Sequence, residues 1–156
     1  MNASEVMKQP VYTCSIDASL EQVARVMWEH DCGSVPLVDG DGKAVAMITD
    51  RDIAMACYLQ GKSPREIAAR SAASRSLATV RKDTPLEDVE NRMRDWQIRR
   101  VPVVDDDDRV VGLVTLTDIA VHASPGGRRV GALSAEAISR TLQAICEHRS
   151  NEPLTS

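Results

Sequence analysis

Aromatic residues are scarce in this sequence, and phenylalanine is absent. The aromatic side chains are two tyrosines and two tryptophans, Tyr12, Trp28, Tyr58 and Trp96. A hydrophobic core must therefore be built from Val, Ile, Leu, Met and Ala, and the sequence offers little for an aromatic platform that stacks bases. Positive charge is not in excess either, because 19 Lys and Arg stand against 23 Asp and Glu, for a net charge of −4. This balance argues against a general nucleic-acid binder.

Long apolar runs are also missing. No window approaches the roughly 20 apolar residues that span a bilayer, and residues 1–8 lack the charged-then-apolar pattern of a signal peptide. The four cysteines are widely spaced without a Cys-x-x-Cys pair, which favours free thiols in a reducing compartment; they are Cys14, Cys32, Cys57 and Cys146. We therefore expect a cytoplasmic protein with no membrane and no nucleic-acid partner.

The signatures of catalysis and of metal binding are absent from the sequence as well. No Gly-x-Ser-x-Gly elbow or Walker lysine occurs, and His30, His122 and His148 do not cluster with other ligands at zinc spacing. The acidic run 105–108 lacks EF-hand spacing and is typical of a solvated turn. We expect no enzyme, no metal site and no required cofactor, so a nucleotide hydrolase is the weakest of the function hypotheses.

An internal repeat organises the chain of 156 residues. Val35-Pro36 recurs as Val101-Pro102, and a Thr-x-x-Asp-Ile-Ala segment recurs at residues 49–54 and 115–120, in both cases at an offset of 66 residues (36 to 102, 49 to 115). The same ungapped offset pairs Asp17, Leu20, Val23 and Met27 with identical residues of the second copy. Two small structural repeats that share a core fit this length.

Each copy predicts the same order of elements, β-α-β-β-α. In the second copy, Thr84 is expected to cap a helix over 85–96 that has Pro85 at its first position. Two short apolar runs follow as a hairpin, and a second helix comes after it. In the first copy the hairpin turn ends at Gly42, and glycine accepts the positive φ that such turns need. The fold class predicted is α/β (α+β).

The full division of the chain has six parts. We expect a first repeat over 1–62, a connector over 63–76, a second repeat over 77–123, a flexible break over 124–133, a C-terminal helix over 134–149 and a tail over 150–156. Ser63 and Glu66 form a capping box in the connector. Ser134 is expected to cap the last helix, whose apolar stripe needs a partner surface.

Thr49 with Asp52, and Thr115 with Asp118, lie where a strand of each copy meets its second helix. One interpretation is a capping box, in which the Thr oxygen accepts a backbone N–H and the acid reaches back. The other is a ligand site, because a helix N-terminus favours phosphate and a carboxylate beside it accepts both hydroxyls of a ribose. Both interpretations use the same geometry, and the sequence leaves both open.

Arginines stand where a phosphate-bearing ligand would need them. Arg99 and Arg100 directly precede Val101-Pro102, and Arg51 lies in the first turn of the helix that Thr49 begins. Guanidinium groups there could meet phosphate oxygens, while a solvated arginine or a weak surface ion pair is the alternative.

These features resemble the cystathionine-β-synthase (CBS) domain family. The likeness covers roughly residues 1 to 123 and is most specific at Gly-x-x-Thr-x-x-Asp, which residues 112–118 match completely. The first copy departs from it at Ala46, whose added methyl would crowd a ligand approaching the backbone. The resemblance implies two CBS repeats with pseudo-twofold symmetry, whose cleft offers two sites for adenosine-containing ligands.

The resemblance also implies roles for particular residues. Asp52 and Asp118 would take ribose hydroxyls, Thr49 and Thr115 would hold ribose or phosphate, and Arg51 and Arg100 would face phosphates. The adenine slots would be lined by Val35, Pro36, Val101 and Pro102, with the backbone near Tyr12 to Ser15 and near Thr79, Val80 and Arg81 reading the adenine edge. The ligand would be AMP, ADP, ATP or S-adenosylmethionine, with AMP or ATP favoured, and such modules commonly form homodimers.

Two function hypotheses remain in front. The leading one is a non-catalytic regulatory sensor in which an adenosine-containing ligand changes the relative pose of the repeats and signals to an unidentified protein target. The alternative is a protein-interaction or dimerisation module without a nucleotide ligand, in which Thr-x-x-Asp only caps helices and the C-terminal helix grips a partner.

Overall fold

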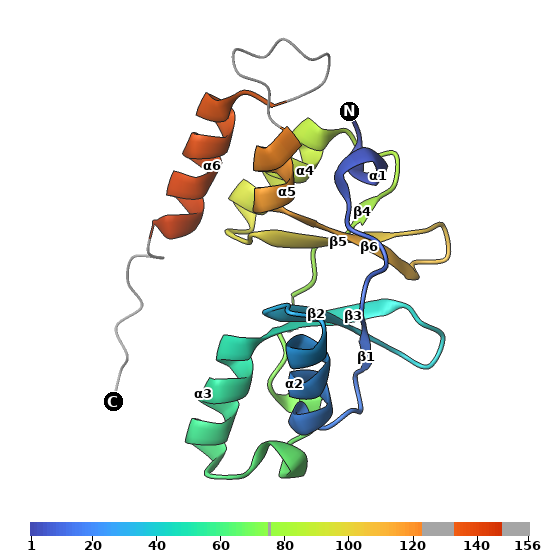
Figure 1. The fold of residues 1–156 in the computed structure, drawn as a ribbon, viewed down its shortest axis with the longest axis vertical. Coiled ribbons are helices and arrows are strands. Elements are labelled where there is room, and N and C mark those ends of the chain that lie inside the picture. Colours follow the sequence, from blue (N-terminus) through green and yellow to red (C-terminus); the bar gives the residue numbers. More distant parts are fainter. Residues whose placement is uncertain (75, 123–132, 148–156) are drawn as a thin grey trace.

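Two three-stranded sheets form the centre of the computed structural model, which describes residues 1–74, 76–122 and 133–147. The first sheet has the order β1 (Cys14–Ser15), β2 (Ser34–Val38), β3 (Ala44–Thr49), and the second has the order β4 (Val80–Arg81), β5 (Arg100–Val104), β6 (Val110–Thr115). In each sheet the first strand is parallel and the third antiparallel to the middle strand. The sheets face each other, and the helices cover their outer sides (Figure 1).

The helices repeat at the same offset as the strands. They are α1 (Ala3–Val6), α2 (Leu20–Glu29), α3 (Asp50–Gln60), α4 (Leu86–Asp95), α5 (Leu116–His122) and α6 (Ala135–Cys146), with short 3₁₀ turns η1 (Pro64–Glu66) and η2 (Ala69–Ser71). The amphipathic helix α2 begins with the capping pair Ser19 and Gln22, and its buried stripe packs on the first sheet. The fold is therefore the predicted α/β arrangement of two repeats with a further C-terminal helix.

The start of α4 differs from the prediction. Pro85 is the N-cap residue, and the Thr84 hydroxyl makes no capping bond to the helix. Instead, Thr84 Oγ1 accepts a hydrogen bond from the Arg81 N–H at 2.9 Å. The prediction that Thr84 caps this helix is therefore wrong, because its hydroxyl closes the turn after β4.

Two short segments exchange between the repeats. In the N-terminal segment, residues 1–8, Ala3 and Val6 are buried in the core of the second repeat, and the Ala3 N–H donates to the Thr84 carbonyl at 2.9 Å. At the equivalent place, Ala69 is buried in the first core, and its N–H donates to the Ala18 carbonyl at 2.8 Å. Each core therefore needs a segment that lies outside its own run of strands, so the repeats fold as one unit.

The turns of the two hairpins also hold the repeats together. The Ala44 N–H donates to the Asp108 carbonyl at 3.1 Å, and the Val110 N–H donates to the Gly42 carbonyl at 3.4 Å. Both turns need a positive φ at the same position, 80° at Gly42 and 62° at Asp108. The glycine predicted from the first turn fits this conformation without strain, whereas the aspartate adopts it as a less common non-glycine case.

Helix α6 packs on the second repeat, against α4 and α5 (Figure 1). The predicted Ser134 cap is present, since its hydroxyl accepts from the Ala137 N–H at 3.2 Å. Thr141 is fully buried and its hydroxyl donates to the buried Glu90 carboxylate, while Ile138 packs against the second core. Part of the apolar stripe therefore finds its partner within the chain. The predicted break at 124–133, apart from Leu133, and the tail at 150–156 lie outside the described residues.

No helix in the described part of the chain is long and apolar enough to cross a membrane.

Candidate functional site

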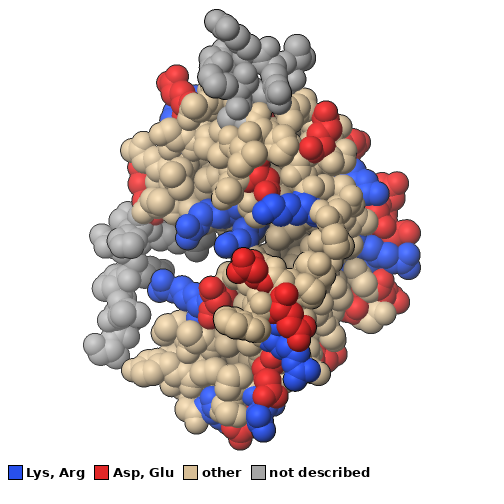
Figure 2. All heavy atoms as spheres, in the orientation of Figure 1, with Lys and Arg blue, Asp and Glu red and all other residues tan. Residues whose placement is uncertain are grey.

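A cavity of about 240 Å³ lies beside the start of α3, between the two repeats. It brings together the predicted site residues Thr49, Asp52 and Arg100. The remaining lining comes from both repeats and from the chain that joins them: Ser34, Met47, Ser74, Ser76, Leu77, Ala78, Ile98 and Arg99. We call this cavity the first cleft. The space-filling view shows the surface hollowed between the repeats, with basic side chains along the upper edge of the hollow and acidic side chains along its lower edge (Figure 2).

The capping box at Thr49 and Asp52 leaves part of the carboxylate open. Asp52 Oδ2 accepts both from the Thr49 N–H and from its hydroxyl, each at 2.8 Å, and the Asp52 N–H donates to Thr49 Oγ1 at 3.2 Å. Among the described residues, no donor reaches the other oxygen, Oδ1. Capping and ligand binding are therefore compatible here, because one oxygen caps the helix and the other stays available to a hydroxyl donor.

Arginine side chains supply the positive charge of the first cleft. Arg99 is exposed and Arg100 half-buried, and neither makes an ion pair with any acid of the described ranges. A Cβ placed on Gly33 would stand 3.8 Å from Arg100 Nη2 and 3.2 Å from Asp50 Oδ2, so this guanidinium lies near the beginning of α3. An anion in the cleft would find both guanidinium groups unengaged.

The second cleft is the pseudosymmetric counterpart, with a volume of about 540 Å³. Thr115, Arg99 and Arg100 line it, together with Lys8, Cys32 and residues of α5 and α6, so both arginines border both clefts. Burial raises the pKa of the Cys32 thiol, so this lining group is a neutral thiol at neutral pH. Asp118 repeats the capping bonds of Asp52, with Oδ2 2.9 Å from the Thr115 nitrogen and 2.6 Å from its hydroxyl oxygen. Its Oδ1 lies 3.3 Å from Lys8 Nζ.

The valines and prolines predicted to line the adenine slots lie in the middle strands β2 and β5. Val35 and Val101 are fully buried in the two cores, and neither lines the first or the second cleft. Pro36 and Pro102 are buried next to them, on the opposite faces, because successive strand residues alternate. Those faces point toward the other repeat (Figure 1).

The structure places Arg51, Thr79 and Val80 outside the lining of both clefts. Arg51 is exposed on the first turn of α3. The Thr79 carbonyl accepts a hydrogen bond from Arg92, and the Val80 side chain is buried in the second core. The segment 76–78, directly before them, lines the first cleft instead.

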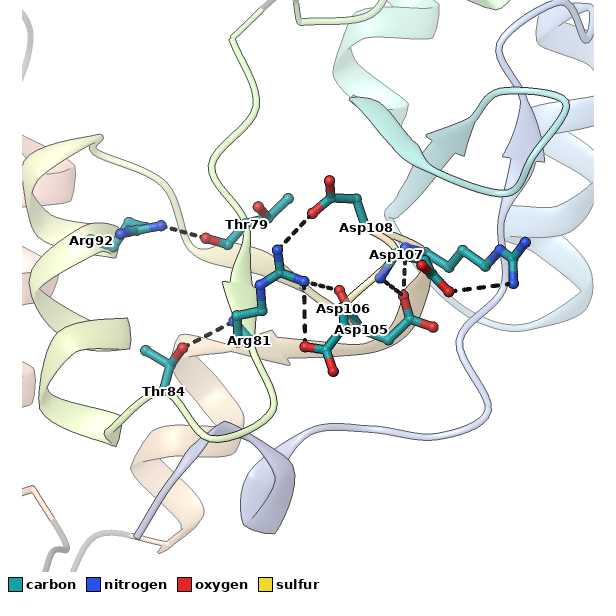
Figure 3. A network of polar contacts seen from close by, with 9 residues as sticks. Thr79, Arg81, Thr84, Arg92, Asp105, Asp106, Asp107 and Asp108 are labelled. Carbon is teal, nitrogen blue, oxygen red and sulfur yellow. Dashed lines mark hydrogen bonds and ion pairs between the residues drawn. The ribbon is translucent and has the colours of Figure 1, made fainter.

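The contacts after Thr79 form a network at the second hairpin (Figure 3). Arg81 Nη2 lies 3.1 Å from Asp108 Oδ1, and Arg81 Nη1 donates to the Asp105 carbonyl. The Arg109 N–H donates to the Asp105 carboxylate at 2.9 Å and lowers the pKa of that group. The oxygens of the acidic turn are therefore bonded to nearby arginines and backbone amides. In the described ranges, no group of three His, Cys, Asp or Glu side chains could hold a metal ion.

The glycine of the second motif has a packing role. A Cβ placed on Gly112 would stand 2.4 Å from Met7 Sδ and 2.9 Å from its Cγ. In the first repeat the equivalent residues are the buried Ala46 and Ala73, which packs on the first core. The larger side chain at Ala46 is therefore accommodated by a smaller one in the exchanged segment, where Ala73 stands in place of Met7.

Sequence reasoning missed Lys8, Ser34 and the segment 76–78 as lining residues. The signal that could have found them is the offset of 66 residues, which pairs Lys8 with Ser74 (8 to 74) and predicts that both segments have equivalent places.

Known proteins match this chain over most of its length. Hypoxic response protein 1 of Mycobacterium tuberculosis is 33% identical over 144 residues, which cover 92% of this chain and 93% of that protein. The chain spans less of other curated relatives: 61% of the uncharacterized protein MK0525 of Methanopyrus kandleri, 23% of a homoserine O-acetyltransferase and 22% of an L-aspartate semialdehyde sulfurtransferase. Two of these relatives are therefore enzymes that are much longer than the matching module.

Solved structures share the fold. The crystal structure of Hypoxic Response Protein I with two coordinated zinc ions has a TM-score of 0.73 and 32% identity, and the match covers 80% of this chain and 100% of that chain. The CBS domain pair of protein MJ0100, in complex with 5′-methylthioadenosine and S-adenosyl-L-methionine, has a TM-score of 0.67 and 34% identity over 78% of this chain and 94% of that chain.

A third structure is the CBS domain protein PAE2072 of Pyrobaculum aerophilum complexed with AMP, with a TM-score of 0.68 and 26% identity over 76% of this chain and 90% of that chain. The family profile of the CBS domain matches twice, at residues 3–58 and 68–124. With two matched copies, two equivalent sheets and paired Thr-x-x-Asp corners, this chain belongs to the CBS domain family as a tandem pair.

Proposed function

We propose that the chain is a non-catalytic regulatory module that binds an adenosine-containing ligand between its repeats. The observation that carries the proposal is the first cleft, where the open oxygen of Asp52 and the unengaged guanidinium groups of Arg99 and Arg100 line one cavity. The related pairs that hold AMP, or S-adenosyl-L-methionine with 5′-methylthioadenosine, support this ligand class.

Each part of the first cleft suits a part of such a ligand. Asp52 Oδ1 can accept a hydrogen bond from a ribose hydroxyl, and Thr49 holds the carboxylate in place. The backbone of 76–78 offers amide and carbonyl groups to an adenine edge, and the arginines offer charge-assisted bonds to phosphate. The described residues supply no group that activates water or a nucleophile in this cavity, which favours binding without turnover.

Calorimetric titration of AMP, ATP and S-adenosylmethionine tests the proposal. We expect saturable binding of at least one of them, and a loss of at least about tenfold in affinity in Asp52→Ala, because a ribose hydroxyl loses a charged acceptor. Asp41→Ala, a change in the exposed first hairpin turn, is the matched control and should bind like the wild type. The proposal fails if none of the three ligands releases heat, or if any of them is turned over.

A specific observation also favours an interaction surface. A groove between α2 and α3 has an apolar side formed by Ala24, Met27, Trp28 and Ile53, and Trp28 is 88% exposed. The rest of its lining is Asp31, Cys32, Gly33 and Asp50. The equivalent groove of the second repeat is covered by α6. We infer that the open groove joins two copies of the chain as a homodimer, since an exposed aromatic residue beside other apolar side chains, with charged residues at the rim, is typical of interfaces.

A further inference from the structure

Lys8 distinguishes the two clefts. It lies in the N-terminal segment at the place that Ser74 takes in the equivalent segment 67–74. Both residues form the same isolated bridge to the last strand of a hairpin, Lys8 with Leu113 and Ser74 with Met47. Their backbones therefore have matching positions relative to the two Thr-x-x-Asp corners, and only their side chains differ.

The side chain of Lys8 contacts Asp118 Oδ1. The equivalent oxygen in the first cleft, Asp52 Oδ1, is open. Lys8 Nζ lies 3.3 Å from Asp118 Oδ1; the Asp118 side chain is 8% exposed, whereas the Lys8 side chain is 71% exposed and covers the carboxylate from the solvent side. Two backbone hydrogen bonds with Leu113, of 2.9 and 3.3 Å, fix the position of Lys8. Both oxygens of Asp118 are thus engaged, one by Thr115 and one by the ammonium group. A ribose hydroxyl would have to displace the ammonium group, and only in this cleft.

The two clefts also differ in which residues line them. The first cleft reaches Asp52 and the segment 76–78. The lining of the second includes neither Asp118 nor residues 10–12, their counterparts at the offset of 66, and it opens instead toward Ile138 and Leu142 of α6. Tyr12 stands where the first cleft has Ala78, and its ring stacks on His30 at 3.4 Å between centroids.

We propose that Lys8 determines specificity by closing the second cleft to a ribose, so that the chain takes one adenosine-containing ligand, at Asp52. The inference rests on the proposed function, because it concerns which of the two carboxylates meets the ligand. Since an ion pair with the buried carboxylate must be broken, we expect the second cleft to bind about tenfold more weakly than the first.

The test is calorimetric titration of AMP, ATP and S-adenosylmethionine into the wild type and two mirror variants. Lys8→Ser gives the second cleft the residue of the first, and Ser74→Lys does the reverse. We expect one equivalent per chain for the wild type, two for Lys8→Ser, and about tenfold weaker binding for Ser74→Lys. The bridges of residues 8 and 74 use backbone atoms, so circular dichroism should show unchanged folding.

The possible outcomes separate this inference from the proposed function. Two equal equivalents in the wild type, or a single equivalent in Lys8→Ser, overturns the role of Lys8 and leaves nucleotide binding intact. In Lys8→Ser combined with Asp118→Asn, the second equivalent should disappear, and its persistence contradicts the assignment to Asp118. If neither the wild type nor Lys8→Ser releases heat, the proposed function fails and this inference fails with it.

Discussion

Gly112 is the residue at which the most specific motif of the chain meets the exchanged segment. Its missing Cβ leaves room for Met7, so Gly112→Ala forces Met7 or the strand to move. We expect a loss of about 1–3 kcal/mol in the free energy of unfolding, as for other overpacked positions. Gly40→Ala is the control, because a Cβ there meets nothing within 4 Å. Urea unfolding measures both variants, and equal stability of the two would contradict the packing role of Gly112.

The two Thr-x-x-Asp corners show how far single residues could be interpreted from sequence. The spacing predicts the capping bonds at both corners, and the structure has them. Which carboxylate stays open could not be predicted, because it depends on Lys8, far away in sequence, and on strand β6, which positions it. Likewise the prediction that Thr84 caps a helix was wrong, because its hydroxyl accepts a hydrogen bond from the Arg81 N–H instead.

At the scale of elements, the exchanged segments carry the link between the repeats. Ala3, in α1, is fully buried in the second core, whereas its neighbour Ser4 is exposed. Ala3→Asn should lower the free energy of unfolding by about 2 kcal/mol or more, because a larger polar group enters a packed core. Ser4→Asn is the matched control and should change it little. Urea unfolding measures both variants, and an unchanged free energy of unfolding in Ala3→Asn would show that α1 is not part of the second core.

The elements that could be predicted are those with local signals. The strands, the helices α2 and α4 and the two hairpins follow from period and turn residues, because these depend on neighbours in sequence. The exchange of 1–8 and 67–74 and the docking of α6 on α4 could not be predicted, since they depend on which exposed faces meet in space. The boundaries of the six parts predicted for the chain stay predictions.

At the scale of the whole molecule, the open α2/α3 groove predicts self-association. At the position equivalent to Trp28 the second repeat has Arg94, so Trp28→Arg gives the open groove the residue of the groove that α6 covers. We expect light scattering to show a dimer for the wild type and a monomer for Trp28→Arg, because a charge would be buried in the interface. Trp96→His, which copies His30 outside the groove, should remain dimeric. A monomeric wild type, or a dimeric Trp28→Arg, would contradict this interface.

The asymmetry of the two clefts is the property of the whole molecule that connects these scales. Residue 8 is a lysine and residue 74 is a serine, and the exchanged segments place each of them beside one Thr-x-x-Asp corner. Because Lys8 pairs with Asp118, the tandem pair offers one open carboxylate, that of Asp52. Regulation by such a module needs a ligand whose binding favours one relative pose of the repeats. The hairpin bridges and exchanged segments are the contacts that such a change of pose would alter.

The most direct measurement is a set of crystal structures of the chain grown with AMP, with ATP and with S-adenosylmethionine. The account predicts that at least one of these ligands occupies the first cleft, with ribose hydroxyls on Asp52 Oδ1 and adenine against the backbone of 76–78, while Lys8 stays on Asp118. Empty first clefts in all three crystals, or a ligand found only at Asp118, would contradict it.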